Sequence, residues 1–583
     1  MHVTMQLEMW HDLSYGYRDI GLFARALHNA ANGQGLWVDS LHRSILGEHA
    51  FIGLWLLVPL CKLGADPFLL LILVSSIVLN GSAIIIYWYV KKHFASNVSA
   101  LMAALAWLLL PWFGCLIFAH SYGFHLIYLT VPLLLLGLLF TELERYRSAT
   151  VAMLLALTMR EDIALTVAAW GLFLFYAKKR RLLGLCTFGA SVAYLIIAIY
   201  VIVPHYRGGP YPHVHSYLLA NPEGRFTRQQ VLIAASFFFT LFMPLAGLPL
   251  REWKRLCVAV PCLAETVLTT NKELHNICFQ YYTPAIAVLF AASIEAWRRR
   301  RARDDMYLSQ SKDRAATSTT QQMAKSNGVS TRGLRDGWCL LMCALAGQVY
   351  LGLGPISNNP ATAQSSLGLR SEIPQIEHVR SLISQDTSVT ASYRIASHFL
   401  DYGRLWLVGD ANLGDCVIID DRDNWDASHP RAALIRAQRL GGYRPLLADY
   451  HLIVLVKDEK LTFDSSRFMP TGIPPNFESI VYGLGHGVRL VARRITIGKH
   501  LADGERQCRI SIIWTSQDSI DVDYRFGLVL ERSGTRWGPF FFVRGAYPTV
   551  IWTPGKLYRD DVDIVVPENL VAGLQAMKAV LLY

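Results

Sequence analysis

Long apolar runs dominate residues 45 to 356 and constrain the fold more than any other feature of the chain. A transmembrane helix needs about 20 predominantly apolar residues, and several of these runs reach that length. Residues 357 to 583 have instead the composition of a soluble protein. The sequence therefore predicts a multi-pass helical membrane region, 1–356, followed by a globular C-terminal part.

The apolar runs predict about ten membrane spans. These are residues 67–90, 98–118, 124–141, 148–159, 163–177, 182–204, 229–250, 256–270, 281–297 and 338–356. Basic clusters begin after the first, third, fifth, seventh and ninth spans, at Lys91, Arg145, Lys178, Arg251 and Arg298. Ten spans place every cluster on one side of the membrane, which the positive-inside rule assigns to the cytoplasm. The net charge of +11 is thereby explained by topology, and we expect no nucleic-acid partner.

Three consecutive charges, Arg160, Glu161 and Asp162, separate the apolar runs 151–159 and 163–176. A single helix would hold each charge at membrane depth, at a cost of about 2.5–3.5 kcal/mol per residue on insertion scales. It would also reverse the side of every later basic cluster. We therefore predict two short helices that meet at an external turn, where water or a cavity reaches the charges. The alternative is a solvated turn without function, but ionisable residues at this depth favour a functional site.

The predicted external loops are rich in histidine, tyrosine and carboxylate side chains. The polar residues among them are Asp19, Glu48, His49, His120, His125, His205, His213, His215, Glu273 and His275. A polar cavity with aromatic walls above a hydrophobic bundle would suit a polar substrate that is linked to a lipid.

The soluble part divides by pattern into two predicted domains. Residues 357–465 mix helix-like and strand-like stretches, which indicates an α/β domain. Residues 466–583 contain alternating strands separated by Gly, Pro and Asp turns, which predicts a β-sandwich.

Several stretches, in this order, resemble the DUF2079 membrane proteins of bacteria and archaea. They are YRDIGLF at 17–23, LGEHAF at 46–51, YGFH at 122–125, REDIAL at 160–165, QYYTP at 280–284, and SVTAS at 388–392 with Arg394. The resemblance covers most of residues 15–460, and this family is grouped with the GT-C-type membrane glycosyltransferases. It implies a GT-C-like helical bundle for the membrane region.

The chain departs from the family pattern at two places. Family members usually have a transmembrane helix before the DIGLF stretch, where this sequence has a short and mostly polar segment. The usual His-Phe-Ser-Pro after the acidic position is here His49-Ala50-Phe51-Ile52. Because of the second departure, the turn beside the membrane is not expected to be built in the way that is usual for the family.

The resemblance also implies a catalytic carboxylate. GT-C-type enzymes use a polyprenyl-phosphate sugar and an acidic residue in the first external loop, and the matching residue here is Asp19. It would accept a proton from the acceptor hydroxyl, or help to hold a divalent metal. The alternative is that Asp19 only caps the helix predicted at residues 20–30.

The charged triplet supplies the predicted substrate site. Arg160 matches the geometry of a donor phosphate, and the alternative is an internal ion pair with Glu161 or Asp162. The two carboxylates would orient the acceptor or a metal. Mg²⁺ or Mn²⁺, which prefer oxygen ligands, would be held by Asp19 and Glu161.

Three external histidines, His49, His125 and His275, are further candidates for binding phosphate or sugar, and we expect one of them to be used. The sequence contains no Walker A loop, no G-x-S-x-G and no H-E-x-x-H motif.

We therefore expect a GT-C-type glycosyltransferase that is embedded in the cytoplasmic (inner) membrane. It would transfer a hexose or pentose from a polyprenyl-phosphate donor to a glycan, lipid or protein acceptor on the external face. The C-terminal domains would lie on the external or periplasmic side. One alternative is a non-catalytic scaffold of envelope assembly, which would tolerate neutralisation of Asp19 and of the triplet. Another is a lipid or polar-solute transporter, which would show broken helices in both halves.

Overall fold

The structure is a computed structural model that describes most of the chain. Outside the described part lie residues 1, 12, 14, 18, 119–122, 214–227, 269–276, 278, 317–330, 352–372, 421–422, 424–429, 450–451, 459–460, 462–467, 501–504, 532 and 583. The described residues form two compact units, Met1–Arg370 and Ser371–Tyr583.

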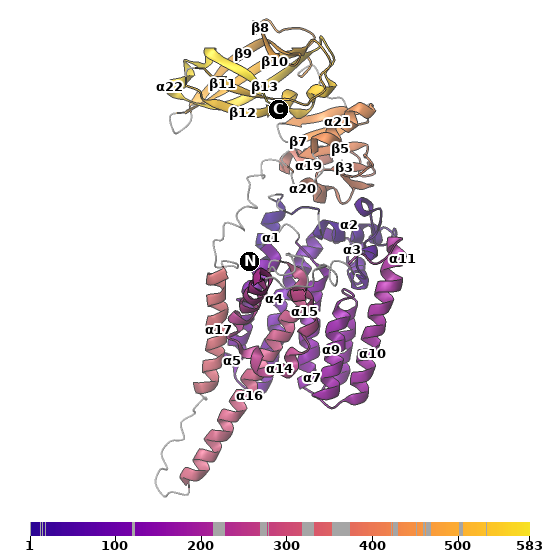
Figure 1. The fold of residues 1–583 in the computed structure, drawn as a ribbon, viewed down its shortest axis with the longest axis vertical. Helices are drawn as coiled ribbons and strands as arrows, with labels where there is room; N and C mark the ends of the chain where they lie inside the picture. The colour runs from indigo at the N-terminus through magenta and orange to yellow at the C-terminus, as the bar shows by residue number, and fades with distance from the viewer. Residues whose placement is uncertain are drawn as a thin grey trace. The chain divides into compact units, whose positions relative to one another are not determined.

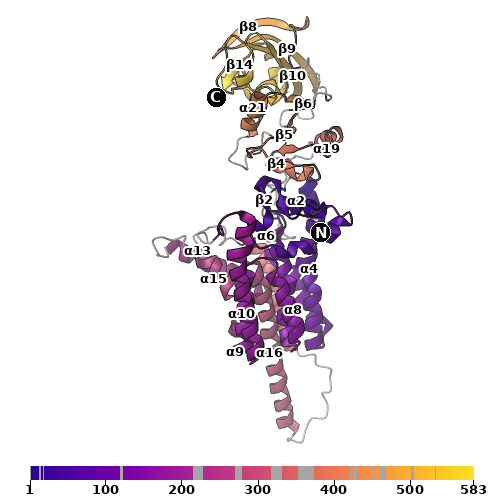
Figure 2. The ribbon, with the colours of Figure 1, turned by 90° about the vertical axis from the view of Figure 1, so that its right-hand side faces the viewer.

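The first unit is a bundle of helices (Figures 1 and 2). Its long helices are α4 (Pro67–Phe94), α5 (Asn97–Leu108), α7 (Thr130–Glu142), α8 (Tyr146–Leu157), α9 (Ile163–Tyr176), α10 (Arg181–Ile197), α13 (Arg228–Phe242), α16 (Thr283–Ala316) and α17 (Thr331–Leu351). Shorter helices connect them: α6 (Pro111–Phe118), α11 (Val203–Arg207), α14 (Trp253–Leu256) and α15 (Val260–Leu268). The helices share one large apolar core, which includes Trp107, Trp170 and Trp297.

By length and composition, three helical stretches in the described part could cross a membrane: Pro67–Phe94, Asn97–Leu116 and Arg181–Arg207. A pair bent by 92°, Val231–Leu245 and Leu248–Leu256, makes a fourth if it counts as one span. Several other predicted spans correspond to apolar helices of 10–17 residues, such as Tyr146–Leu157 and Ile163–Tyr176. The ten-span topology stays a prediction.

The chain signals the ends of the longest helix by local chemistry. Asp66 caps α4 by accepting a hydrogen bond from the Leu69 N–H at 2.8 Å, and Pro67 occupies the first turn, where its missing N–H does no harm. The last turn carries Lys91 and Lys92, and Ala95 ends the helix with a left-handed conformation. Twenty-eight residues at 1.5 Å each give a helix of about 42 Å.

The predicted break at the charged triplet is confirmed. Helix α8 ends at Leu157 and α9 begins at Ile163, and residues 158–162 form the turn between them. Helix α9 then packs closely on α10. A Cβ atom on Gly171 would lie 2.8 Å from the carbonyl oxygen of Gly184, so the two backbones approach as nearly as glycine allows.

Basic clusters that the positive-inside pattern places on one side meet in one ion network at one end of the bundle. Arg255 pairs with Glu142, Glu252 and Glu295, and Lys178 also pairs with Glu142. Arg298 and Arg299 add further pairs to Glu295. Lys178 follows the C-terminus of α9, whereas the charged turn precedes its N-terminus. The network and the turn are therefore separated by the length of α9, about 21 Å for 14 residues.

Before α4, the chain forms helices α1 (His2–His11) and α2 (Ile20–Ala31), the strands β1 (Trp37–Val38) and β2 (Arg43–Ser44), the 3₁₀ turns η2 (Ile45–Gly47) and η3 (Ile52–Leu56), and helix α3 (Val58–Lys62). The buried Arg25 guanidinium donates to Asp39 through Nε at 2.6 Å and so ties α2 to the segment that follows β1. This fixes the loop that leads into residues 45–51.

The second unit begins with a mixed sheet of five strands in the order β4-β3-β5-β7-β6. The strands are β3 (Val389–Ala391), β4 (Leu405–Leu407), β5 (Cys416–Asp420), β6 (Arg444–Asp449) and β7 (Leu452–Val456). Strands β4, β3 and β5 are parallel, and β7 and β6 continue the sheet in antiparallel pairing. Helices α19 (Ile373–Leu382) and α21 (Pro430–Leu440) accompany it.

The rest of the second unit contains two antiparallel sheets, in the orders β13-β10-β9-β8 and β12-β11-β14. The strands are β8 (Glu478–Gly485), β9 (Val488–His500), β10 (Glu505–Ser516), β11 (Arg525–Leu530), β12 (Arg536–Phe541), β13 (Leu557–Pro567) and β14 (Met577–Leu582). Their apolar side chains, such as Trp514 and Phe526, belong to the same core cluster as Val417 and Ile453 of the mixed sheet. The two sequence patterns are thus joined by one hydrophobic core.

Candidate functional site

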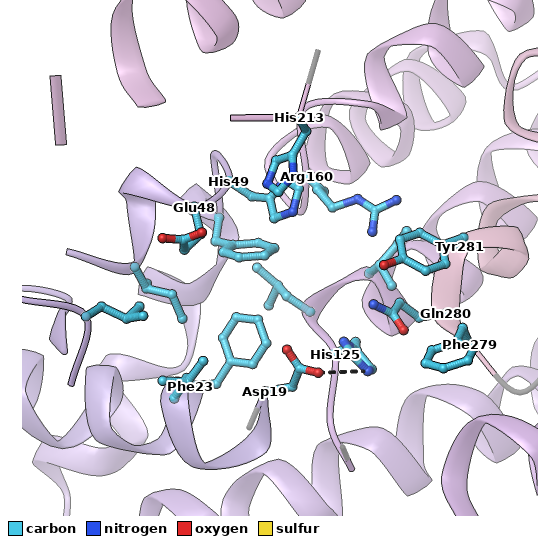
Figure 3. Close-up of a pocket in the computed structure, with 16 residues that line it drawn as sticks. Asp19, Phe23, Glu48, His49, His125, Arg160, His213, Phe279, Gln280 and Tyr281 are labelled. Carbon is cyan, nitrogen blue, oxygen red and sulfur yellow. Dashed lines mark ion pairs between the residues drawn. The ribbon is translucent and has the colours of Figure 1, made fainter. Parts of the chain in front are cut away.

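A cavity of about 250 Å³ lies among segments of the first unit that are far apart in the sequence. Its polar lining consists of Asp19, Glu48, His49, His125, Arg160, His213 and Gln280, and its aromatic lining of Phe23, Phe51, Phe279 and Tyr281. Figure 3 shows these side chains around the shared space. The predicted combination of polar and aromatic walls is therefore present, although only some of the predicted residues contribute to it.

Asp19 faces this cavity. It occupies the residue before α2, but its side chain makes no capping hydrogen bond, and its backbone φ is 38°, a value that side-chain-bearing residues rarely adopt. The carboxylate is 32% exposed, and its Oδ2 lies 3.7 Å from Nε2 of His125 (Figure 3). Helix capping thus does not account for Asp19, and its carboxylate shares the cavity with an imidazole.

Arg160 lines the cavity with a nearly buried side chain. Its guanidinium donates two parallel hydrogen bonds to the carboxylate of Asp162, of which the one from Nε to Oδ1 measures 2.6 Å. The guanidinium also lies 5.8 Å from the ring centre of Tyr281. The internal ion pair that the sequence left open is present. It orients the guanidinium in a wall of the cavity.

Glu161 is not among the residues that line the cavity, and its side chain is 1% exposed. Its Oε1 accepts hydrogen bonds from Nδ1 of His49 and from the hydroxyl of Tyr211, each at 2.6 Å, and its Oε2 accepts one from the Ala50 N–H at 2.9 Å. Burial alone would raise the pKa of Glu161, but the charge and the hydrogen bonds of these partners hold it well below its ordinary value. Glu161 is therefore an ionised internal anchor.

Two groups that the sequence reasoning did not single out as site residues also line the cavity. Glu48 accepts hydrogen bonds from Nε of Arg43 at 2.9 Å and from Nη1 of Arg207 at 3.4 Å. His213 stacks on His49, with ring centres 4.3 Å apart and planes inclined by 8°. Both were visible only as members of polar external loops, because no local motif marks them.

Asp19 and Glu161 are the two predicted metal ligands. Asp19 faces the cavity, whereas both oxygens of Glu161 already accept hydrogen bonds, so Glu161 does not fit as a metal ligand. Within the described residues there is no group of three or more His, Cys, Asp or Glu side chains arranged to hold a metal ion. Of the predicted histidines, His49 and His125 line the cavity, and His275 lies outside the described residues.

Acidification is expected to loosen the segment that carries His213. Burial, and then the positive charge of His49, lowers the pKa of His213 from its ordinary value of 6.5 to about 4. When the segment detaches, His213 binds a proton at the ordinary pKa, so detachment becomes easier as the pH falls from about 6.5 to about 4. We expect amide hydrogen exchange of residues 207–213, corrected for the intrinsic rate, to rise over that window.

The matched variant for this prediction is His213→Phe, which keeps an aromatic ring on His49 but removes the titration. Its exchange over the same pH window should rise less than that of the wild type. Equal changes in both proteins would contradict the prediction.

The family model described as "Predicted membrane protein (DUF2079)" matches residues 10–399. A comparison with curated proteins finds no match. Among solved structures, ArnT from Cupriavidus metallidurans bound to undecaprenyl phosphate is similar at 14% identity and a TM-score of 0.48, over 79% of this chain and 98% of that one. Arabinosyltransferase EmbB from Mycobacterium smegmatis is similar at 14% identity and a TM-score of 0.32, over 100% of this chain and 63% of that one.

Proposed function

Because the chain belongs to the DUF2079 family of predicted membrane proteins, we propose that it is a membrane-embedded glycosyltransferase of the GT-C type. It transfers a sugar from a polyprenyl-phosphate donor to an acceptor hydroxyl on the external face of the cytoplasmic membrane. The observation that carries the proposal is the cavity in which the carboxylate of Asp19 and the guanidinium of Arg160 share one lining. A base and a phosphate-binding cation are the two groups that such a transfer needs.

Asp19 is the proposed base. Its carboxylate is accessible from the cavity, and His125 at 3.7 Å is suited to orient it. In the transfer, the acceptor oxygen bonds to the anomeric carbon while the bond from that carbon to the phosphate oxygen breaks. The electron pair of the broken bond leaves with the phosphate, and the acceptor proton passes to Asp19.

Arg160 is the proposed contact for the donor phosphate. A guanidinium held by Asp162 is preorganised, so that little side-chain entropy is lost when the phosphate binds. Glu48 and Gln280 in the same lining are suited to hydrogen-bond with sugar hydroxyls, and Phe51 and Tyr281 offer rings for stacking.

The basic ion network at the opposite end of α9 supports a cytoplasmic location for that end and an external one for the cavity. The second unit then follows on the external or periplasmic side, as an α/β layer and a β-sandwich, where it binds the glycan, lipid or protein acceptor. Mg²⁺ or Mn²⁺ stays a prediction that concerns Asp19 alone.

Purified protein in nanodiscs should bind and turn over polyprenyl-phosphate sugars, and Arg160→Ala should weaken the binding. Hydrogen bonds to charged groups contribute about 1.5–3 kcal/mol, so we expect the Kd for polyprenyl phosphate to rise about 10–100-fold. Arg160→Lys keeps the positive charge but not the planar guanidinium. Its Kd for polyprenyl phosphate should lie between those of the wild type and Arg160→Ala.

The control is Arg147→Ala, at the exposed start of α8 and outside the cavity lining, which should leave the Kd unchanged. If the wild-type protein binds no lipid-linked sugar, the chain is a scaffold and the proposed function is wrong. If Arg160→Ala binds as tightly as the wild type, Arg160 is not the phosphate contact.

A further inference from the structure

The carboxylate of Glu161 joins three segments that the sequence keeps far apart. His49 and Ala50 come from the segment after η2, Tyr211 comes from the segment after α11, and Glu161 itself lies in the turn between α8 and α9. All three donors point at one buried carboxylate, and each is within 2.9 Å of it. Such charge-assisted hydrogen bonds are roughly twice as strong as neutral ones.

This arrangement sets the orientation of the His49 imidazole. An ionised carboxylate has no hydrogen to donate and can only accept hydrogen bonds. Nδ1 of His49 therefore carries the hydrogen and donates the hydrogen bond to Glu161. The plane of the ring is fixed by the stacked His213. The remaining ring nitrogen, Nε2, is then the polar atom that His49 offers to the cavity it lines.

We propose that His49 is a catalytic residue that donates a hydrogen bond from Nε2 to the departing phosphate oxygen, and that Glu161 is the positioning residue that holds this imidazolium in place. This inference rests on the proposed function, because the departing phosphate is that of the polyprenyl donor. Both ring nitrogens donate in the charged ring, and the ionised Glu161 balances its positive charge. His49 thereby complements Arg160, which contacts the phosphate from the same cavity lining.

The charged and titratable groups around His49 agree with this assignment. From the turn after α8 it faces the anion of Glu161, and from the segment after α11 it faces the stacked ring of His213. Tyr211 of the same segment donates its hydroxyl hydrogen bond to Glu161. His213 is neutral at pH 7, because its pKa is about 4, so it stacks on the ring without repelling it. The neighbouring Glu48 is engaged by Arg43 and Arg207.

The proposed role balances charge in the transfer step. As the bond from the anomeric carbon to the phosphate oxygen breaks, negative charge grows on that oxygen, and the Nε2–H of His49 donates to it. No proton needs to leave the imidazolium, since the product is polyprenyl phosphate itself. The proton of the acceptor goes to Asp19 and then to water.

The first test separates catalysis by His49 from a purely structural role. Asn places its amide nitrogen where the imidazole has Nδ1, so His49→Asn keeps the donor to Glu161 and removes only Nε2. We expect kcat to fall about 10²–10³-fold, the effect of removing one donor to a developing anion, with KM changed less than threefold. His42→Asn, an exposed histidine before the same segment, should retain wild-type kcat. Wild-type kcat in His49→Asn would overturn the proposal.

The second test concerns Glu161. In Glu161→Gln an amide of the same size replaces the carboxylate that accepts the hydrogen bond from Nδ1 of His49. Residues that act as a unit have non-additive effects, so Glu161→Gln should lower kcat in the wild-type background and change it little in the His49→Asn background. A purely structural role of Glu161 would lower the amount of folded protein by the same factor in both backgrounds. An equal fall of kcat in the two backgrounds would overturn the positioning role.

The activity of the wild-type protein distinguishes failure of this inference from failure of the proposed function. If the wild type turns over a lipid-linked sugar and His49→Asn has the same kcat, only the role of His49 is overturned. If the wild type turns over no lipid-linked sugar, the proposed function itself is contradicted.

Discussion

Asp19→Asn is expected to reduce turnover of polyprenyl-phosphate sugars by about 10²–10⁴-fold, the usual contribution of a general base. The amide has the size of the carboxylate and still offers an oxygen toward His125, but it cannot accept the proton of the acceptor hydroxyl. KM for the donor should change little, because the donor phosphate is assigned to Arg160. The measurement is kcat and KM in nanodiscs, with thermal unfolding of each protein recorded alongside.

This substitution is well matched to the local backbone. Asp19 makes no capping hydrogen bond, so α2 loses no cap in the variant. Asparagine also tolerates a positive φ better than most residues, and the backbone at position 19 has a φ of 38°. The folded state should therefore be retained, and lost turnover would report on chemistry.

The control is Asp66→Asn, which changes a carboxylate that does cap a helix, at the start of α4 and away from the cavity. Asparagine caps helices about as well as aspartate, so both stability and turnover should remain at wild-type levels. If Asp19→Asn retains turnover within threefold of the wild type, Asp19 is not the base, and the acceptor proton leaves by another route.

Gly171→Val is expected to destabilise the protein by about 3 kcal/mol or more, at the upper end of the range for overpacking. A Cβ at this position would lie 2.8 Å from both the oxygen of Gly184 and the nitrogen of Phe188, and Gly184 in turn approaches Phe175 as closely. These neighbours are backbone atoms, so no change of rotamer relieves the contact. The helices α9 and α10 must then separate.

The separation should also reach the site, because α9 begins directly after the Arg160–Asp162 pair and α10 continues toward α11 and Arg207. We expect both a lower unfolding temperature in detergent and weaker binding of polyprenyl phosphate. The matched control is Gly189→Val on α10, where an added Cβ meets no atom within 4 Å. Equal stability of the two variants would show that the close contact of α9 and α10 does not support the bundle.

Features that depend on neighbouring residues were predictable from the sequence. The break between α8 and α9 follows from three charges whose burial in one helix would be costly, and the structure confirms it. The strands β5 (Cys416–Asp420) and β7 (Leu452–Val456) lie in the region 357–465 that was predicted to contain strands, because short apolar β-branched runs are a strong local signal. The basic end of α4 was predictable in the same way, because Lys91 and Lys92 directly follow the apolar run.

The hydrophobic core that residues 357–465 share with residues 466–583 was harder to predict from the sequence. A change from mixed to alternating periodicity predicts a boundary at residue 465, yet the core cluster joins Val417 and Ile453 with Trp514 and Ile564. Periodicity indicates which face of a strand is apolar. It does not indicate which other apolar face will cover it.

The sequence by itself determined the helical character of the apolar segments, the charged turn, and the membership of Asp19, His49, His125 and Arg160 in polar loops near those segments. Only the tertiary structure decided their partners. His49 meets Glu161 across 112 residues of chain, and Tyr211 meets the same carboxylate across 50. The physical reason is that a buried carboxylate takes its donors from whichever segments the packed bundle brings to it, and no spacing in the chain records that proximity.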